Sequence, residues 1–116
     1  MAELLVTIRR DPTFGLTLVI AAGGIFVELF AEAELELFPV SEQRIETMLR
    51  RLSIWPLLRG YRGRQGADVT ALCTQITRLC AAAESLGDAL TELELNPVLV
   101  TPEGAVAVDA LLSTGG

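Results

Sequence analysis

Three oxygen-bearing side chains near the C-terminus, Glu94, Asn96 and Asp109, have the types and spacing of a metal site. Alternate residues of a β-strand share a face, so a strand over residues 92–101 places Glu94 and Asn96 on the same side. Two carboxylates and an amide oxygen are hard donors that suit Mg²⁺, above all where substrate phosphates supply further ligands.

The turn that follows decides whether Asp109 joins this set. A two-residue loop at Pro102-Glu103 sets Asp109 directly opposite Asn96, with their Cβ atoms ~5 Å apart. A glycine bulge at Gly104 instead shifts the register by one residue and turns Asp109 to the other face. The second outcome leaves an ordinary hairpin with a polar face.

Four residues of the N-terminal third are candidates for contact with phosphate or nucleotide. Gly23 and Gly24 offer backbone N–H groups without side chains, although a tight hairpin turn is the favoured explanation of the pair. Glu28 follows them and faces either a cleft or solvent. Arg10 either binds a phosphate through its positive charge or is an exposed arginine that binds no ligand.

The composition excludes several chemistries. The sequence has no histidine, and its nine basic residues are all arginine. It therefore has no imidazole base or ligand, no phosphohistidine, and no Schiff-base or P-loop lysine. The net charge of −6 and the pI of about 4.5 argue against a general nucleic-acid binder. Tyr61 with arginine at 59, 62 and 64 could contact a single-stranded nucleic acid, but in so acidic a chain this segment is interpreted as a docking loop for the missing subdomain or for a CoA-binding partner.

The apolar content is high for a chain without a membrane span. Hydrophobic residues make up 51% of the sequence, and the mean hydropathy is +0.47. The longest uncharged stretch, residues 12–27, is shorter than the about 18 needed to cross a bilayer, and the N-terminus lacks a signal pattern. We expect a cytoplasmic protein with no membrane contact, whose surplus apolar surface is covered by a partner or by more of the same protein.

The two cysteines are expected to be buried and unpaired. Cys73 and Cys80 lie seven residues apart in a strongly helical stretch. Seven residues of helix rise ~10.5 Å, which exceeds the ~7 Å Cα separation that a disulfide tolerates. Both fall on the apolar stripe and are interpreted as small hydrophobic residues.

The first third of the chain has the pattern of β-strands. Apolar or alternating runs predict strands over residues 3–9, 16–22, 25–30 and 34–38. The Gly23-Gly24 pair predicts a tight hairpin between the second and third of these strands.

Two helices and a final hairpin follow. Ser41 is a suitable N-cap for a helix with apolar residues at 45, 48, 49 and 52, and Trp55-Pro56 ends it before a loop over 59–66. Asp68 caps a longer helix, which Gly87 stops. The order β-β-β-β-α-α-β-β predicts an α+β fold, a mostly antiparallel sheet with two helices on one face. We expect one domain over residues 1–116.

Several blocks of the sequence resemble a known family. The C-terminal run ELELNPVLV, with PEG and VAVDA after it, is similar to the end of an ATP-grasp domain, in the variant of NDP-forming acyl-CoA synthetases and the succinyl-CoA synthetase beta subunit. The blocks RDPTFG, GGIFVE and GYRG resemble further parts of the same family in the same order. The resemblance extends over nearly the whole chain and covers only the second half of that domain.

The resemblance implies a nucleotide site and a reaction. In such enzymes the residues matching Glu94, Asn96 and Asp109 hold Mg²⁺ on the phosphates of the nucleotide. The overall reaction joins a carboxylic acid to CoA at the expense of ATP, through an acyl phosphate and a phosphoenzyme. The acyl substrate and the choice between ATP and GTP stay open.

What the chain lacks defines the expected partners. The phosphate-binding lysine belongs to the N-terminal ATP-grasp subdomain, and the phosphorylated histidine belongs to a CoA-binding domain or subunit. We therefore expect this chain to bind Mg²⁺ and ATP or ADP together with those partners and to be inactive alone. The sequence does not determine whether it forms a homo-oligomer. The alternatives are a non-catalytic module that senses nucleotide or acyl-CoA, for example fused to a protein acetyltransferase, and a plain interaction domain.

Overall fold

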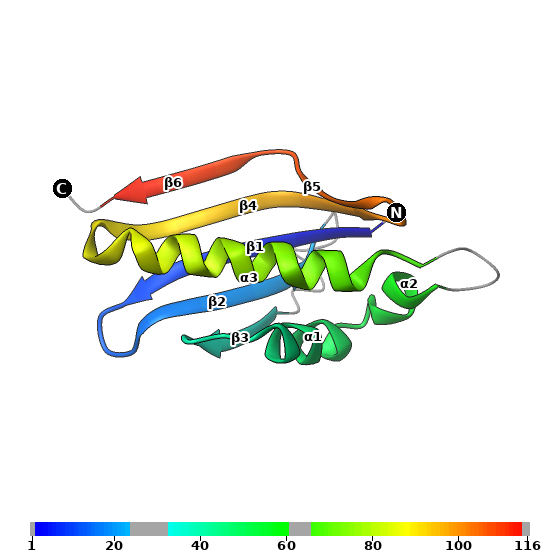
Figure 1. Ribbon diagram of the computed structural model, residues 1–116, viewed down its shortest axis with the longest axis horizontal. Helices are drawn as coiled ribbons and strands as arrows, with labels where there is room; N and C mark the ends of the chain where they lie inside the picture. The colour runs from blue at the N-terminus through cyan, green and yellow to red at the C-terminus, as the bar shows by residue number, and fades with distance from the viewer. Residues whose placement is uncertain (1, 24–32, 61–65, 115–116) are drawn as a thin grey trace.

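The computed structural model describes residues 2–23, 33–60 and 66–114, and these form an antiparallel sheet with helices on one face (Figure 1). The sheet has the order β3-β2-β1-β4-β5, and β6 also pairs with β4. Its strands are β1 (Ala2–Asp11), β2 (Gly15–Ala22), β3 (Ala33–Leu37), β4 (Leu90–Thr101), β5 (Gly104–Ala107) and β6 (Ala110–Thr114). The helices are α1 (Glu42–Arg51), α2 (Trp55–Arg59) and α3 (Val69–Ser85), followed by the 3₁₀ turn η1 (Gly87–Ala89). The expected α+β fold class is confirmed.

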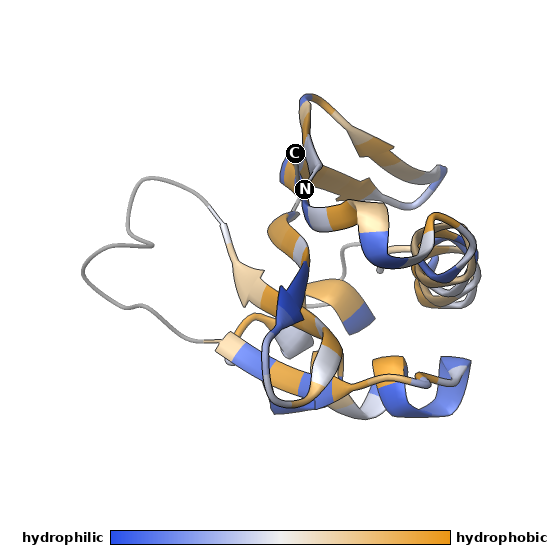
Figure 2. Cartoon of the chain, turned by 90° about the vertical axis from the view of Figure 1, so that its left-hand side faces the viewer, coloured by the Kyte–Doolittle hydropathy of each residue, from blue (hydrophilic) through white to orange (hydrophobic). Residues whose placement is uncertain are grey.

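The core lies between the sheet and the helices. On β1, Leu4, Val6 and Ile8 are at most 1% exposed, because alternate residues of the strand face the helices. Leu18 and Ile20 of β2 lie opposite Ile8 and Val6 and are equally buried. Figure 2 shows the long helix α3 end-on beside the sheet. Each fully buried aliphatic side chain contributes ~1.5–3 kcal/mol relative to exposure.

Both long helices begin as their sequences indicate. The Ser41 hydroxyl accepts a hydrogen bond from the Arg44 amide (3.2 Å), and an Asp68 carboxylate oxygen accepts one from the Ala71 amide (3.0 Å). These contacts satisfy N–H groups that have no partner within the first turn. Gly87 follows the end of α3 with a positive φ of 61°, so the predicted stop is also confirmed.

Three details differ from the expectations. Residues 55–59 form the short helix α2, because a proline is tolerated in the first turn of a helix, where its missing N–H needs no partner. The final strand is interrupted at Val108 and Asp109 and resumes as β6, which extends to Thr114.

The third difference is at Gly23-Gly24, where the prediction of a tight hairpin is wrong. Over Thr17–Ala21, β2 pairs on one side with β1 and on the other with β3, so neither edge is free for a strand that follows directly. Gly23 instead continues the β1 pairing, and its amide donates to the Glu3 carbonyl (2.8 Å). Residues 24–32, which include the predicted strand over 25–30, lie outside the described residues.

The cysteines behave as expected. Cys73 and Cys80 are both free and both buried, on the face of α3 that packs into the core.

Candidate metal and nucleotide site

The last hairpin has the register that the two-residue loop predicts. Thr101 pairs with Gly104, and further along Leu95 pairs with Ala110. Between these pairs the Asn96 amide donates to the Asp109 carbonyl (3.2 Å), which places the two residues opposite each other. Gly104 has a φ of 141° in the turn and introduces no shift.

Glu94 lies on the face of the sheet away from the helices, which we call the open face. Its neighbours Leu93 and Leu95 pack against the core, so Glu94 points to the other side of the sheet because the side chains of a strand alternate. Glu94 of β4 lies opposite Thr7 of β1. At Asn96 and Pro97 the strand departs from this alternation, since two residues of β4 there lie opposite Leu5 alone. The Asn96–Pro97 peptide bond is cis.

The donor set fits Mg²⁺ shared with phosphates better than a closed protein site. Asn96 and Asp109 are exposed and Glu94 is half-buried, so solvent and a ligand can reach all three. An Asp109 carboxylate oxygen accepts from the Ala110 amide (2.8 Å), which orients the group. Within the described residues no three His, Cys, Asp or Glu side chains form a cluster able to hold a metal. Mg²⁺ commonly keeps several waters and takes one or two carboxylates plus substrate phosphates.

Arg10 lies apart from this set. Its guanidinium donates to the carbonyl oxygens of Leu90 (3.0 Å) and Gly87 (2.6 Å), and it lies 3.8 Å from the carboxylate of Asp88. Its partner in β2 is the buried Leu16, so it belongs to the helix side of the sheet. In this structure Arg10 of β1 therefore binds η1 and the first residue of β4.

The other phosphate candidates are only partly described. Gly23 uses its amide in the sheet, and a Cβ added there would lie 3.3 Å from Glu3 atoms, so the position has little room for a side chain. Gly24 and Glu28 lie outside the described residues. The structure therefore pairs the backbone of Asn96 with that of Asp109 and sets Glu94 two residues earlier on the same strand, while Arg10 lies on the other side of the sheet. That the three side chains form one metal site stays a prediction.

An apolar groove on the open face was missed by the sequence reasoning. It has a volume of about 440 Å³ and is lined by Phe14, Val19, Leu35 and Leu37, with Arg9 at its side. Phe14 is 65% exposed and Leu35 60%. The alternation of glutamate and leucine over residues 34–37 indicated a strand with one apolar face, but it did not indicate whether that face is turned toward the helices or away from them.

The side of β3 that faces the helices carries glutamates because α1 offers arginines to pair with them. Glu36 forms an ion pair with Arg44 of α1, and Glu34 forms one with Arg51 at 3.4 Å. The charges of α1 therefore hold the glutamates on the helix side, and the leucines between them face outward.

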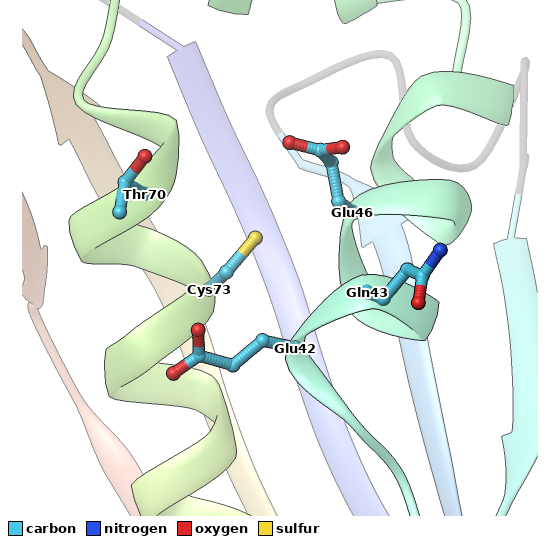
Figure 3. A pocket seen from close by; sticks show the side chains of 5 residues that line it. All are labelled: Glu42, Gln43, Glu46, Thr70 and Cys73. Carbon is cyan, nitrogen blue, oxygen red and sulfur yellow. The ribbon is translucent and has the colours of Figure 1, made fainter.

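A shallow pocket between α1 and α3 contains a thiol that is poorly suited to catalysis. Cys73 points from α3 toward Glu42 and Glu46 of α1 (Figure 3). Burial, and then the carboxylates of Glu46 and Glu42, raise the pKa of Cys73 to about 11. Because the thiolate is the nucleophilic form, this thiol is unreactive near neutral pH.

The antiparallel sheet with helices on one face agrees with the fold of an ATP-grasp protein. The family model described as an ATP-grasp domain matches residues 1–113. The chain belongs to this family.

The relatives identify the branch of the family. The chain is 33% identical to the beta subunit of acetate–CoA ligase [ADP-forming] II of Pyrococcus furiosus over 98% of its own length and 49% of that subunit. It is 31% identical to 4-hydroxybutyrate–CoA ligase [ADP-forming] of Nitrosopumilus maritimus over 88% of its length and 14% of that protein. The chain thus spans about half or less of these relatives.

A solved structure gives the same result. The dinucleotide-forming acetyl-coenzyme A synthetase 1 of Ca. Korarchaeum cryptofilum, in complex with coenzyme A and Mg-AMPPCP, superposes with a TM-score of 0.88 at 34% identity. The match covers 98% of this chain and 53% of that one. The resemblance to the ATP-grasp domain of NDP-forming acyl-CoA synthetases is confirmed. Separately, none of the helices among the described residues is both long and apolar enough to cross a membrane.

Proposed function

We propose that this chain supplies the Mg-nucleotide phosphate site of an NDP-forming acyl-CoA synthetase. Glu94, Asn96 and Asp109 would hold Mg²⁺ on the phosphates of ATP or ADP. When bound, the ion neutralises charge on the transferring phosphoryl group and orients it. The observation that supports the proposal is the direct pairing of Asn96, within the carboxylate-bearing strand β4, with Asp109 at the exposed break between β5 and β6.

The open face supports a clamp with a second half. The groove beside Phe14, Leu35 and Leu37 is apolar and exposed, as expected for a surface that another subdomain covers. The solved relative, with the matched segment making up 53% of its chain, was obtained with Mg-AMPPCP and coenzyme A. The partners we propose are the N-terminal ATP-grasp subdomain and a CoA-binding domain or subunit that carries the phosphorylated histidine.

Calorimetry tests the metal site. Mg-ATP and Mg-ADP are titrated into the protein with any further domains present, as wild type and as Asp109→Ala. Losing one charge-assisted contact of roughly 1.5–3 kcal/mol weakens binding by about tenfold or more. Asp88→Ala is the matched control, because Asp88 is a fully exposed acid in η1, away from the last hairpin. Equal binding by Asp109→Ala and wild type would remove Asp109 from the site.

A second candidate is a regulatory module of the same ancestry. It agrees with the absence of histidine and lysine from this sequence, an absence that the synthetase proposal explains by placing those groups in the partner domains. Such a module binds nucleotide or acyl-CoA without turnover, for example next to a protein acetyltransferase. A coupled assay for acyl-CoA formation separates the two, since only the synthetase turns over when its partner domains are present.

A further inference from the structure

A second cleft lies on the helix side of the sheet, where α1, α2 and the start of α3 meet. It has a volume of about 380 Å³, within the range of ligand pockets. We call it the Trp55 pocket. Its apolar part is formed by Trp55, Leu58 and Ala67, and its charged part by Arg50, Arg59 and Glu46.

The backbone around the Trp55 pocket is held firmly. The Ala67 amide donates to the Leu58 carbonyl (2.8 Å), which joins the end of α2 to the segment before α3. A Cβ at Gly66 would lie only 2.4 Å from the Arg59 carbonyl oxygen, so this close approach requires glycine. Leu58 is fully buried below the cleft. The pocket is therefore part of the folded framework.

Its charge contrasts with that of the whole chain. The Arg50 guanidinium lies 5.2 Å from the Trp55 ring centroid and 3.4 Å from a Glu46 carboxylate oxygen. Arg59 is exposed and has no ion pair within the described part of the chain. Two guanidinium groups thus face one carboxylate, in a protein of net charge −6 whose residues 50–67 contain no acid.

We propose that the Trp55 pocket binds a phosphate-bearing small molecule. The planar guanidinium groups of Arg50 and Arg59 match the geometry of phosphate oxygens, and an organic body would lie against Trp55 and Leu58. The pocket is on the side of the sheet opposite to Glu94, so this proposal is independent of the metal site. The phosphate comes from one of three sources: inorganic phosphate, a nucleoside diphosphate, or the 3′-phosphate end of coenzyme A.

The sole tryptophan of the chain reports directly on this pocket. Inorganic phosphate, ADP and adenosine 3′,5′-bisphosphate are titrated separately in EDTA, which prevents Mg²⁺-dependent binding at the other site. Binding is followed by Trp55 fluorescence and, independently, by calorimetry. We expect a saturable response to at least one probe, and the tightest probe identifies the source of the phosphate. Arg59→Gln is expected to weaken it about tenfold or more.

Three variants make the result decisive. Arg59→Lys keeps the charge but lacks the planar guanidinium group that binds two phosphate oxygens at once. We expect it to bind more tightly than Arg59→Gln and more weakly than wild type. Arg78→Gln removes the same charge from an exposed site on α3, ~13 Å along the helix from Val69, and is expected to bind normally. Asp109→Asn is also expected to bind normally in EDTA, which separates this pocket from the proposed metal site.

The proposal is overturned if none of the probes binds saturably, or if Arg59→Gln binds as wild type does. An equal loss in Arg78→Gln would also overturn it, since it would indicate attraction by overall charge. Far-UV circular dichroism of each variant confirms that the fold is retained.

Discussion

The amide of Asn96 donates to the carbonyl of Asp109 across the last hairpin, at 3.2 Å. This one bond joins the backbones of two residues 13 positions apart and places them opposite each other. The pairing depends on the length of the turn at Pro102-Glu103, so the geometry of the candidate site is decided in the turn.

The first prediction concerns that turn. Gly104 has a φ of 141°, and a Cβ there would meet nothing within 4 Å. The cost of Gly104→Ala is therefore conformational, and we expect the free energy of unfolding to fall by about 1 kcal/mol or more. Urea denaturation measures it, with Glu103→Ala as a neighbouring exposed control. A stability equal to wild type would show that this backbone conformation carries no cost.

The second prediction separates a structural role of Arg10 from a ligand role. Arg10→Gln loses the bonds to Gly87 and Leu90, so unfolding should become easier by about 1–2 kcal/mol. Mg-nucleotide affinity should stay within about twofold of wild type. Arg78→Gln serves as a control for loss of charge. A large loss of nucleotide affinity without a change in stability would instead place Arg10 at the phosphates.

The third prediction contrasts the two faces of the sheet. Leu18→Ala opens a cavity in the core and should cost ~2–5 kcal/mol. Leu35→Ala, at a side chain 60% exposed, should change the stability of the isolated chain by less than about 1 kcal/mol. If the open face docks a second subdomain, Leu35→Ala weakens that association instead. Chemical denaturation and a binding assay with the partner subdomain measure the two effects.

The fourth prediction concerns alkaline pH. Burial raises the pKa of Cys73 and of Cys80 from 9.0 to about 11, with nearby glutamates adding to the effect. The unfolded state therefore loses these protons first, so stability is fully present below pH 9 and falls as the pH rises toward 11. Since the chain has no lysine, few other groups titrate in this window.

Urea denaturation at pH 8, 9.5 and 11 measures the loss, and Cys80→Ala should reduce its pH dependence. Both thiols should also react slowly with a thiol reagent at pH 8 until urea unfolds the chain. Fast reaction of the folded protein would contradict their burial.

Local patterns in the sequence predicted much of the fold. Ser41 and Asp68 cap their helices because a side-chain oxygen next to a helical run has one favourable partner, the free N–H of the first turn. The sequence restricted the last hairpin to two registers, and the structure has the one that a two-residue loop predicts, with Asn96 opposite Asp109. The family resemblance rested on the same hairpin.

Non-local choices were predicted less well. The tight hairpin at Gly23-Gly24 was inferred from two glycines, but the second neighbour of β2 is β3, which begins at Ala33. Which strands pair depends on the free edges of the whole sheet, and no local pattern records that. Arg10 was assigned by its charge, whereas its bonding depends on η1, some 80 residues away.

The sequence by itself determined the available chemistry, which is carboxylates, an amide and arginines without histidine or lysine, and it restricted the last hairpin to two possible registers. These properties are fixed by residue type and by short-range backbone geometry. Only the tertiary structure decided that Asp109 lies opposite Asn96, that Leu35 faces outward and that Arg10 binds η1. It also brought Arg50, Arg59 and Trp55 into one cleft. Each of these depends on which distant elements pack together, because burial and long-range hydrogen bonds are properties of the assembled fold.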